Sequence, residues 1–218
     1  LPVSLLGFVP GITTPGGVTH QSIEDVGILR TIPNMTIFDC GDATDVESAL
    51  NICKEVNGPI YVRMLRGQMP RLFSPDKPTE FNKGRVISEG DDVALFSSSI
   101  CTEEAMRATQ WLEKKGVSVQ HVHITTLKPF TDPLVVDSIK KVKHGVVTME
   151  NHVTIGGLGT AVGEVMLEHQ LHKQLIKVGI NDEWTHGASK PYLLKKYGLD
   201  AASLIRSEER RVGKECRS

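Results

Sequence analysis

The sequence has no excess of either charge. Its 218 residues include 25 lysines and arginines and 26 aspartates and glutamates, so the formal net charge is −1 with neutral histidines. A surface balanced in this way produces no field that would gather nucleic acid or an anionic membrane. We therefore expect neither as a partner, whereas a small neutral or anionic substrate stays open.

Long apolar runs and clustered cysteines are also missing. No stretch approaches the roughly 20 apolar residues of a membrane span, and residues 1–8 lack the basic start and long apolar body of a secretory signal. No CxxC pair exists, which disfavours a zinc knuckle, a thioredoxin-type motif and a compact disulfide framework. The four cysteines are Cys40, Cys53, Cys101 and Cys216. We expect a cytoplasmic protein with reduced thiols.

What the chain does contain is an alternation of strand-like and helical segments. With 39% hydrophobic and 23% charged residues it can bury a core, and the alternation predicts an α/β fold with a parallel sheet. In a first domain, residues 1–75, we expect strands at 3–7, 35–38 and 60–64. Helices are expected to begin at a capping box of Ser22 and Asp25 and at an Asp42 cap. Because the sequence enters a strand-like run at once, this domain is expected to lack its front half.

A complete, smaller α/β domain is predicted over residues 84–205. Residues 76–83 are interpreted as the linker. They overlap the polar stretch 65–82, in which Pro70, Pro75 and Pro78 disfavour regular structure. The expected strands are 93–97, 117–124, 145–149 and 174–178, with helices beginning at a Thr102 cap and at Asp132-Pro133 and short closing helices at 190–197 and 201–205. Residues 206–218 are almost all charged, and we expect a non-native or disordered tail there.

One histidine and two arginines are the candidates for chemistry. His20 lies in a loop between a strand and a helix, and ligands of α/β sheets bind at strand ends. A loop histidine satisfied by the backbone is the plainer alternative. Arg63 and Arg66 fall at and after the third strand, so at least one guanidinium is expected over the sheet edge, where its forked donors suit a phosphate. A solvated salt bridge is the alternative for them.

The residues around these candidates resemble the pyrimidine-binding domain of transketolases. Three segments carry the similarity in order: 17–25 (GVTHQSIED), 30–35 (RTIPNM) and 61–66 (YVRMLR). Four later segments resemble the transketolase C-terminal domain: 126–130 (TLKPF), 150–152 (ENH), 156–159 (GGLG) and 179–182 (GIND). The resemblance covers about residues 1–205. It implies the C-terminal part of an enzyme that transfers a two-carbon ketol unit between sugar phosphates.

The resemblance also implies roles for the three candidates. In that family the histidine of the THQ loop lies close to the sugar, which implies a catalytic and substrate-binding role for His20. An arginine after the following strand binds the substrate phosphate, which implies that role for Arg66, with Arg63 as a second substrate-binding arginine. Many transketolases carry an acidic residue in a DG(x)TH pattern where this sequence has Gly16, so a carboxylate for a substrate hydroxyl is missing.

The cofactor implied by the resemblance is thiamine diphosphate with Mg²⁺. Its GDG motif is missing, since Gly41-Asp42 is followed by Ala43 and Gly90-Asp91 by Asp92, and no suitable asparagine follows either. We therefore expect the cofactor to be bound mainly by residues outside this chain, in an N-terminal diphosphate-binding domain or subunit. The chain alone is expected to be inactive, and the assembly to be a homodimer or a heterotetramer.

Other motifs carry less weight. The glycines of 157–163 superficially resemble a dinucleotide-binding loop, but the last glycine comes one residue late, and close helix packing explains them better. His121 with His123 and His169 with His172 have no evident third metal ligand. For both pairs we expect polar surface, and no metal site is predicted.

Three alternatives to a transketolase stay open. A deoxyxylulose phosphate synthase shares the domain order, although residues 21–24 (QSIE) fit transketolase better. The beta subunits of 2-oxo acid dehydrogenases share the architecture, but Arg66 would have no phosphate ligand there. A nonenzymatic dimerisation or regulatory module would not need His20 beside Arg63 and Arg66.

Overall fold

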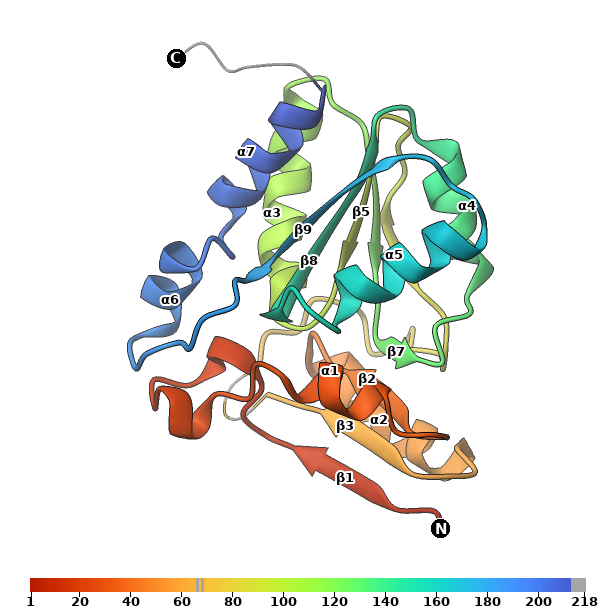
Figure 1. Cartoon of the computed structure of the whole chain (residues 1–218), viewed down its shortest axis with the longest axis vertical. Helices are drawn as coiled ribbons and strands as arrows, with labels where there is room; N and C mark the ends of the chain where they lie inside the picture. The colour runs from red at the N-terminus through yellow and green to blue at the C-terminus, as the bar shows by residue number, and fades with distance from the viewer. Residues whose placement is uncertain (66, 68, 213–218) are drawn as a thin grey trace.

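The computed structural model describes residues 1–65, 67 and 69–212. These residues form two β-sheets with helices packed on them, the first sheet in the lower half of Figure 1 and the second in the upper half. No helix within the described ranges is both long and apolar enough to cross a bilayer.

The first sheet is built from both predicted domains. Its order is β1-β3-β2-β7, and its strands are β1 (Ser4–Gly7), β2 (Thr36–Asp39), β3 (Ile60–Arg63) and β7 (Thr126–Lys128). The first three run parallel, whereas β7 pairs antiparallel with β2 and places Thr126 opposite Phe38. The accompanying helices are α1 (Asp25–Arg30) and α2 (Ala43–Glu55), with short 3-10 helices η1 (Gly11–Thr13) and η2 (Val18–His20). A shared sheet therefore joins the two domains.

The second sheet belongs to the second domain alone and has the order β4-β6-β5-β8-β9. It is parallel except for β4, which pairs antiparallel with β6. Its strands are β4 (Arg85–Ser88), β5 (Val93–Ser97), β6 (Val119–His123), β8 (Gly145–Val153) and β9 (Gln174–Ile180). Its helices are α3 (Cys101–Lys114), α4 (Pro133–Lys141), α5 (Leu158–Glu168), α6 (Lys190–Lys196) and α7 (Ala201–Val212).

Alternate residues of β5 enter two different cores. Val93 and Leu95 pack with residues of α3, α6 and α7, whereas Ala94 and Phe96 pack with residues of α4 and α5. Figure 1 shows these two groups of helices on opposite sides of the sheet. A parallel strand covered on both faces is apolar along its whole length, and all five residues of β5 are buried.

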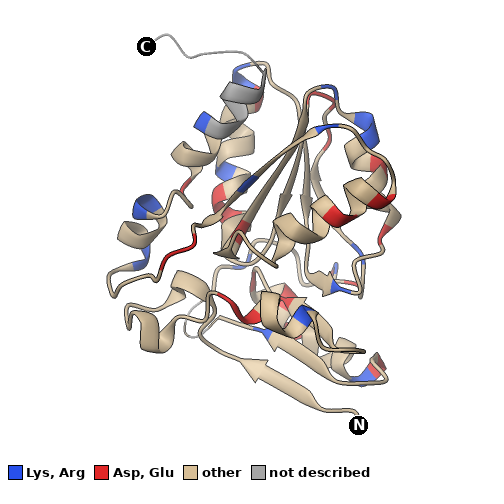
Figure 2. Ribbon diagram, viewed as in Figure 1, with Lys and Arg blue, Asp and Glu red and all other residues tan. Residues whose placement is uncertain are grey.

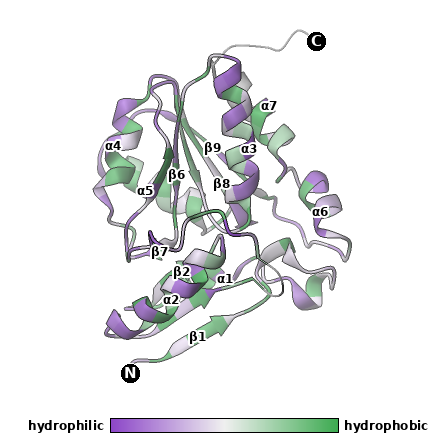
Figure 3. Ribbon diagram, turned by 180° about the vertical axis from the view of Figure 1, so that it is seen from behind, coloured by the Kyte–Doolittle hydropathy of each residue, from purple (hydrophilic) through white to green (hydrophobic). Residues whose placement is uncertain are grey.

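The surface matches the balanced composition. Figure 2 shows charged residues of both signs spread over the helices of both domains. Strand β1 at the edge of the first sheet is different, because Leu5 and Leu6 are exposed there. Apolar colour is visible along this strand in Figure 3.

The predicted α/β class and two caps are confirmed. Asp42 caps α2 by accepting a hydrogen bond from the Asp45 amide at 2.9 Å. Asp132 caps α4 by accepting one from the Leu134 amide at 3.0 Å, with Pro133 in the first turn. In both places a short acceptor side chain stands directly before the helical period.

Other predicted boundaries are wrong. The Ser22 capping box does not form, since α1 begins at Asp25 and Glu24 accepts the Ile23 amide instead. Helix α3 begins at Cys101 without a side-chain cap, and the Thr102 hydroxyl contacts His123. Strands β4 and β7 were not predicted. Helix α7 continues to Val212, past the expected end of regular structure at residue 205.

Candidate functional site

The loop that carries His20 leaves the carboxyl end of β1. It passes through η1 and η2, and His20 is the last residue of η2. Its side chain is exposed, and among the described residues its ring makes one hydrogen bond, between Nδ1 and the Thr19 hydroxyl at 2.8 Å. An exposed imidazole of this kind can donate a hydrogen bond or accept a proton. The expected place of His20 in a loop between a strand and a helix is therefore confirmed, whereas its substrate role stays a prediction.

The chain segment that leads to Arg66 leaves the same edge of the sheet. Strands β1 and β3 are parallel neighbours, and Gly7 lies opposite Arg63 in their register. Because both strands end at this level, the segment after Gly7 and the segment after Arg63 emerge side by side. Arg66 itself lies outside the described residues, so its predicted phosphate role stays a prediction.

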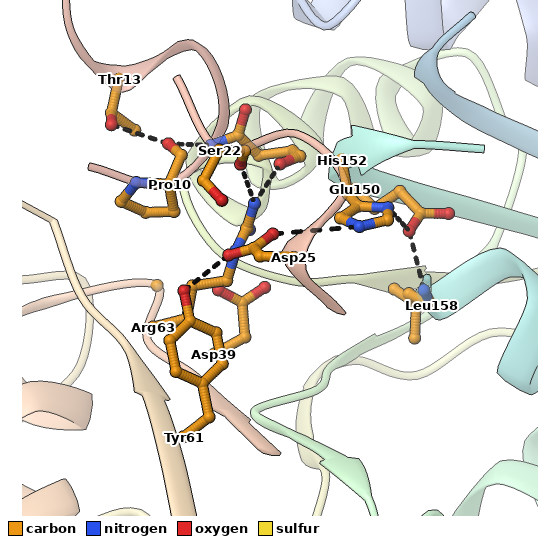
Figure 4. A network of polar contacts seen from close by, with 12 residues as sticks. Pro10, Thr13, Ser22, Asp25, Asp39, Tyr61, Arg63, Glu150, His152 and Leu158 are labelled. Carbon is orange, nitrogen blue, oxygen red and sulfur yellow. Dashed lines mark hydrogen bonds and ion pairs between the residues drawn. The ribbon is translucent and has the colours of Figure 1, made fainter. Parts of the chain in front are cut away.

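Arg63 does not project over the sheet edge. Its side chain is completely buried. Nε donates to Asp25 at 2.9 Å and Nη1 to Asp39 at 3.4 Å, while Nη2 donates to the main-chain carbonyls of Ser22 at 3.0 Å and Asn151 at 2.8 Å (Figure 4). The expectation of a substrate contact is thus corrected: this guanidinium binds protein atoms of both domains and is closed off from solvent.

The carboxylates around Arg63 govern its charge state. Burial alone would lower the pKa of Arg63, but the Asp25 and Asp39 carboxylates raise it above its usual value. Burial would raise the pKa of Asp25, and the Arg63 guanidinium outweighs it so that this pKa is lowered. For Asp39, burial prevails over Arg63 and the pKa is raised. The Tyr61 hydroxyl donates to Asp25 at 2.6 Å, and the cluster is held together by charge-assisted hydrogen bonds.

The second domain meets this cluster through His152. The His152 Nε2 atom accepts a hydrogen bond from the Gly27 amide at 3.2 Å and lies 3.9 Å from Asp25 Oδ1. Its Nδ1 atom is 2.7 Å from the Val153 carbonyl, so the proton of a neutral ring is on Nδ1. Burial, reinforced by the Arg63 charge, lowers the pKa of His152 to about 4. This histidine is therefore a neutral contact between the domains.

Glu150 fixes the glycine turn before α5. Its carboxylate accepts the Leu158 amide at 2.7 Å (Figure 4). It also accepts the Gly159 amide at 2.9 Å. Burial raises the pKa of Glu150 to about 7, although the two amides act against this shift. A side chain at Gly157 would overlap the Glu150 carboxylate, and one at Gly159 would meet Lys177. Close packing, the predicted explanation of the glycines in 157–163, is confirmed for Gly157 and Gly159, whereas a Cβ at Gly163 would meet Leu175 at an ordinary 3.4 Å.

His121 and His123 are buried, so the expectation of polar surface is wrong for this pair. His123 Nε2 lies 2.8 Å from an Asp45 carboxylate oxygen of the first domain, and His121 Nε2 lies 2.8 Å from the Ser97 hydroxyl. Burial, with His123 close by, lowers the pKa of His121 to about 3.

His169 and His172 are exposed as expected, and both come after the end of α5 at Glu168. Within the described ranges no group of three or more His, Cys, Asp or Glu side chains is arranged to hold a metal ion.

Sequence reasoning missed the partners of Arg63. Asp25, Asp39 and Asn151 come from three separate elements, and no spacing links them. One signal existed in β3, where Tyr61 and Arg63 alternate along the strand with the apolar Ile60 and Val62. Alternate residues of a strand share a face, so an inward polar pair could have been suspected.

Comparison with known protein families divides the chain in two. Residues 1–71 match the family model of the transketolase pyrimidine binding domain, and residues 82–204 match that of the transketolase C-terminal domain.

Several curated relatives match nearly the whole chain. A putative transketolase C-terminal section of Methanocaldococcus jannaschii is 35% identical over 218 residues, which cover 99% of this chain and 68% of that protein. A 6-deoxy-6-sulfo-D-fructose transketolase subunit of a Clostridium species is 35% identical, over 95% of this chain and 64% of the relative. A 1-deoxy-D-xylulose-5-phosphate synthase of Caldanaerobacter subterraneus is 29% identical over 94% of this chain, but only 33% of its own length is covered.

The solved structures that resemble this chain include transketolases. A split gene transketolase, described as an inactive beta4 tetramer, superimposes with a TM-score of 0.88 at 35% identity, covering 97% of this chain and 67% of that one. A transketolase of Pichia stipitis in complex with sedoheptulose 7-phosphate has a TM-score of 0.78 at 17% identity, over 98% of this chain and 30% of its own. The second likeness is one of fold.

Proposed function

This chain belongs to the transketolase family, and from that premise we propose that it is the C-terminal section of a thiamine diphosphate dependent transketolase. The proposed reaction moves a two-carbon ketol unit from a ketose phosphate to an aldose phosphate. The chain spans about two thirds of the length of the M. jannaschii relative and a third of the synthase.

One observation carries the proposal. The loop with exposed His20 and the segment that leads to Arg66 leave adjacent parallel strands at the same edge of the first sheet. Ligands of parallel α/β sheets bind outside the carboxyl ends of the strands. We propose that His20 and Arg66 meet the two ends of one sugar phosphate at this edge.

In the proposed mechanism His20 acts at the reacting end. Its imidazole donates a hydrogen bond to the carbonyl or hydroxyl groups of the ketose and exchanges a proton as charge develops there. Arg66 binds the phosphate at the far end, and this binding energy orients the reacting carbon. Arg63 is left out of the substrate contacts, because its donors are taken by protein acceptors.

The cofactor is proposed to be bound mainly by a second domain or subunit. The described residues include no group of three or more His, Cys, Asp or Glu side chains arranged for a metal ion, and the diphosphate site is proposed to lie mainly in the rest of the assembly. When bound by the assembly, thiamine diphosphate would supply the electron sink for carbon–carbon cleavage. The related split-gene protein described as an inactive beta4 tetramer supports the view that one subunit type does not suffice.

The proposal is tested by reconstitution. The chain is combined with an N-terminal diphosphate-binding subunit, and ketol transfer from xylulose 5-phosphate is measured for wild type, Arg66→Ala and His20→Asn. We expect Arg66→Ala to raise KM for phosphorylated donors at least tenfold, since one charge-assisted contact contributes about 1.5–3 kcal/mol. His20→Asn should lower kcat by about 10². An unchanged KM in Arg66→Ala would remove the phosphate role, and an unchanged kcat in His20→Asn the catalytic one.

A synthase reaction is the second candidate, favoured by the 29% identical deoxyxylulose phosphate synthase. The same reconstituted assembly, offered pyruvate and glyceraldehyde 3-phosphate, would then form deoxyxylulose phosphate in preference to ketol transfer. Donors that end in a sulfonate should be included as well, because a relative is named for 6-deoxy-6-sulfo-D-fructose. A guanidinium binds a sulfonate and a phosphate through similar oxygen geometry.

A further inference from the structure

The loop that carries His20 receives buried contacts from the second domain. At its start, the Asn151 side chain of β8 accepts a hydrogen bond from the Ile12 amide at 3.0 Å and donates one to the Pro10 carbonyl at 3.1 Å. Ile12 is completely buried and shares a core with Leu193 of α6. The beginning of the loop is therefore held by residues far away in the sequence.

The end of the loop is held by Thr185. The Thr185 hydroxyl donates to Gln21 Oε1 at 2.5 Å, and Gln21 Nε2 donates to the Thr14 carbonyl at 2.7 Å. Thr185 is 2% exposed and Gln21 3% exposed. These two hydrogen bonds connect Thr185 of the second domain to Gln21, the residue after His20, and connect Gln21 to Thr14 on the other side of the loop. A buried bond of this kind fixes geometry because its loss leaves an unpaired polar atom.

A backbone contact beside Thr185 acts on the same loop. Gly17 has a φ of +70°, which favours glycine, and a Cβ there would lie 3.0 Å from the Gly187 nitrogen. A Cβ at Gly187 would lie 2.5 Å from the Pro15 carbonyl oxygen. The segment around Thr185 thus packs directly against the turn that precedes His20.

We propose that Thr185 is a positioning residue for His20, acting through Gln21. The inference rests on the proposed role of His20 in the reaction, since a fixed loop has kinetic consequences only if His20 meets the substrate. It assigns a task to the C-terminal domain, which holds the loop of the neighbouring domain in place. The Thr185 hydroxyl touches no reacting atom in this scheme.

Loop order is measured first, by amide hydrogen exchange of the full chain. The His20 amide bonds the Gly17 carbonyl and the Ser22 amide bonds the Val9 carbonyl, so both report on the loop. We expect Thr185→Val to speed exchange at these two amides about tenfold or more, as for the loss of one buried hydrogen bond. Thr185→Ser keeps the donor and should remain close to wild type. Unchanged exchange in Thr185→Val would overturn the inference.

A matched control is Thr148→Val. Thr148 is also completely buried, and its hydroxyl has no hydrogen-bond partner among the described residues. The change should therefore leave exchange in the loop as it is. If Thr185→Val did not fold, Gly187→Ala would take its place, because its methyl group must displace the Pro15 carbonyl. Slow, wild-type exchange at His20 in that variant would count equally against the inference.

Activity of the reconstituted enzyme then separates positioning from a general loss of structure. Thr185→Val should lower kcat about tenfold, since misplaced catalytic groups lose rate, and Thr185→Ser should restore it. In a His20→Asn background Thr185→Val should add little, because both changes act through one side chain. A full additional loss there would overturn the positioning role. A wild-type kcat in His20→Asn alone would instead refute the proposed function of His20, and exchange would still decide whether Thr185 orders the loop.

Discussion

Replacing Arg63 by methionine should lower the free energy of unfolding by about 3–5 kcal/mol at pH 7, because it leaves buried carboxylates without their counter-charge. Arg63 is completely buried and contacts two carboxylates and two main-chain carbonyls. Methionine has a similar length and fills most of the same space with an apolar chain. The change therefore tests the charge and the hydrogen bonds, with little change in packing.

The magnitude follows from what each partner loses. Asp25 loses its 2.9 Å contact and keeps the Tyr61 hydroxyl at 2.6 Å. Asp39 loses its 3.4 Å contact. The Ser22 carbonyl loses one donor but keeps the Gly11 amide at 2.6 Å, whereas the Asn151 carbonyl loses the Arg63 donor, and one unsatisfied buried acceptor costs about 1–3 kcal/mol. Protonation of the carboxylates and better apolar packing offset part of this sum, which leaves the range given above.

The dependence on pH distinguishes this cause from a packing defect. In wild type the Arg63 guanidinium lowers the pKa of Asp25, so the stability from that carboxylate is present at neutral pH and is lost as the pH falls through the lowered pKa. Without Arg63 both Asp25 and Asp39 bind protons at higher pH. The difference between wild type and Arg63→Met should therefore narrow from pH 7 to pH 5.

Urea unfolding at the two pH values, followed by circular dichroism, measures this difference. Arg63→Lys is the matched control, because it retains the positive charge but cannot reach four acceptors with one ammonium group. It should fall between wild type and Arg63→Met. A loss below about 1 kcal/mol in Arg63→Met, or a difference that widens on acidification, would refute the reasoning.

Two further predictions concern the turn before α5. The raised pKa of Glu150 means that the folded chain binds this proton more tightly than the unfolded chain, so the free energy of unfolding should decrease as the pH rises through about 7. Urea titrations of Glu150→Gln should show a free energy of unfolding that changes less with pH. A pH dependence equal to that of wild type would exclude Glu150 as its source. Gly157→Ala should cost about 1–3 kcal/mol in thermal melts through overlap with the Glu150 carboxylate. Gly163 lies within α5, where a Cβ would meet Leu175 at 3.4 Å, so Gly163→Ala should gain up to about 1 kcal/mol. Equal melting temperatures for the two variants would contradict the close packing at Gly157.

Features set by nearby residues could be predicted from the sequence. Asp42 and Asp132 each bind an amide two or three residues ahead, and the apolar runs of β5 and β8 mark buried strands of a parallel sheet. The place of His20 in a loop could also be predicted, because its segment stands between a strand-like run and a helical pattern in the sequence. Each of these depends on spacing within a single element or turn.

Features set by distant partners could not be predicted. Arg63 follows an ordinary strand pattern, and it is buried because Asp25 and Asn151 approach it from other elements. Strand β7 has three residues and forms only because β2 offers an open edge, and propensity is a weak guide to so short a segment. His121 and His123 alternate as on a half-exposed strand, but α3 and the first domain cover their face.

Strand β7 also bears on how this chain can be recombined with its relatives. Residues 82–204 match one family model and 1–71 another, yet Thr126–Lys128 form the border of the sheet that contains Ile37 and Phe38. A chimera that exchanged only the later region would import a foreign strand into a host sheet, with its own register and side chains. Crossovers that keep residues 36–39 and 126–128 from one parent would preserve the pairing of β2 with β7. The segment that can be exchanged as a whole is therefore larger than either matched region.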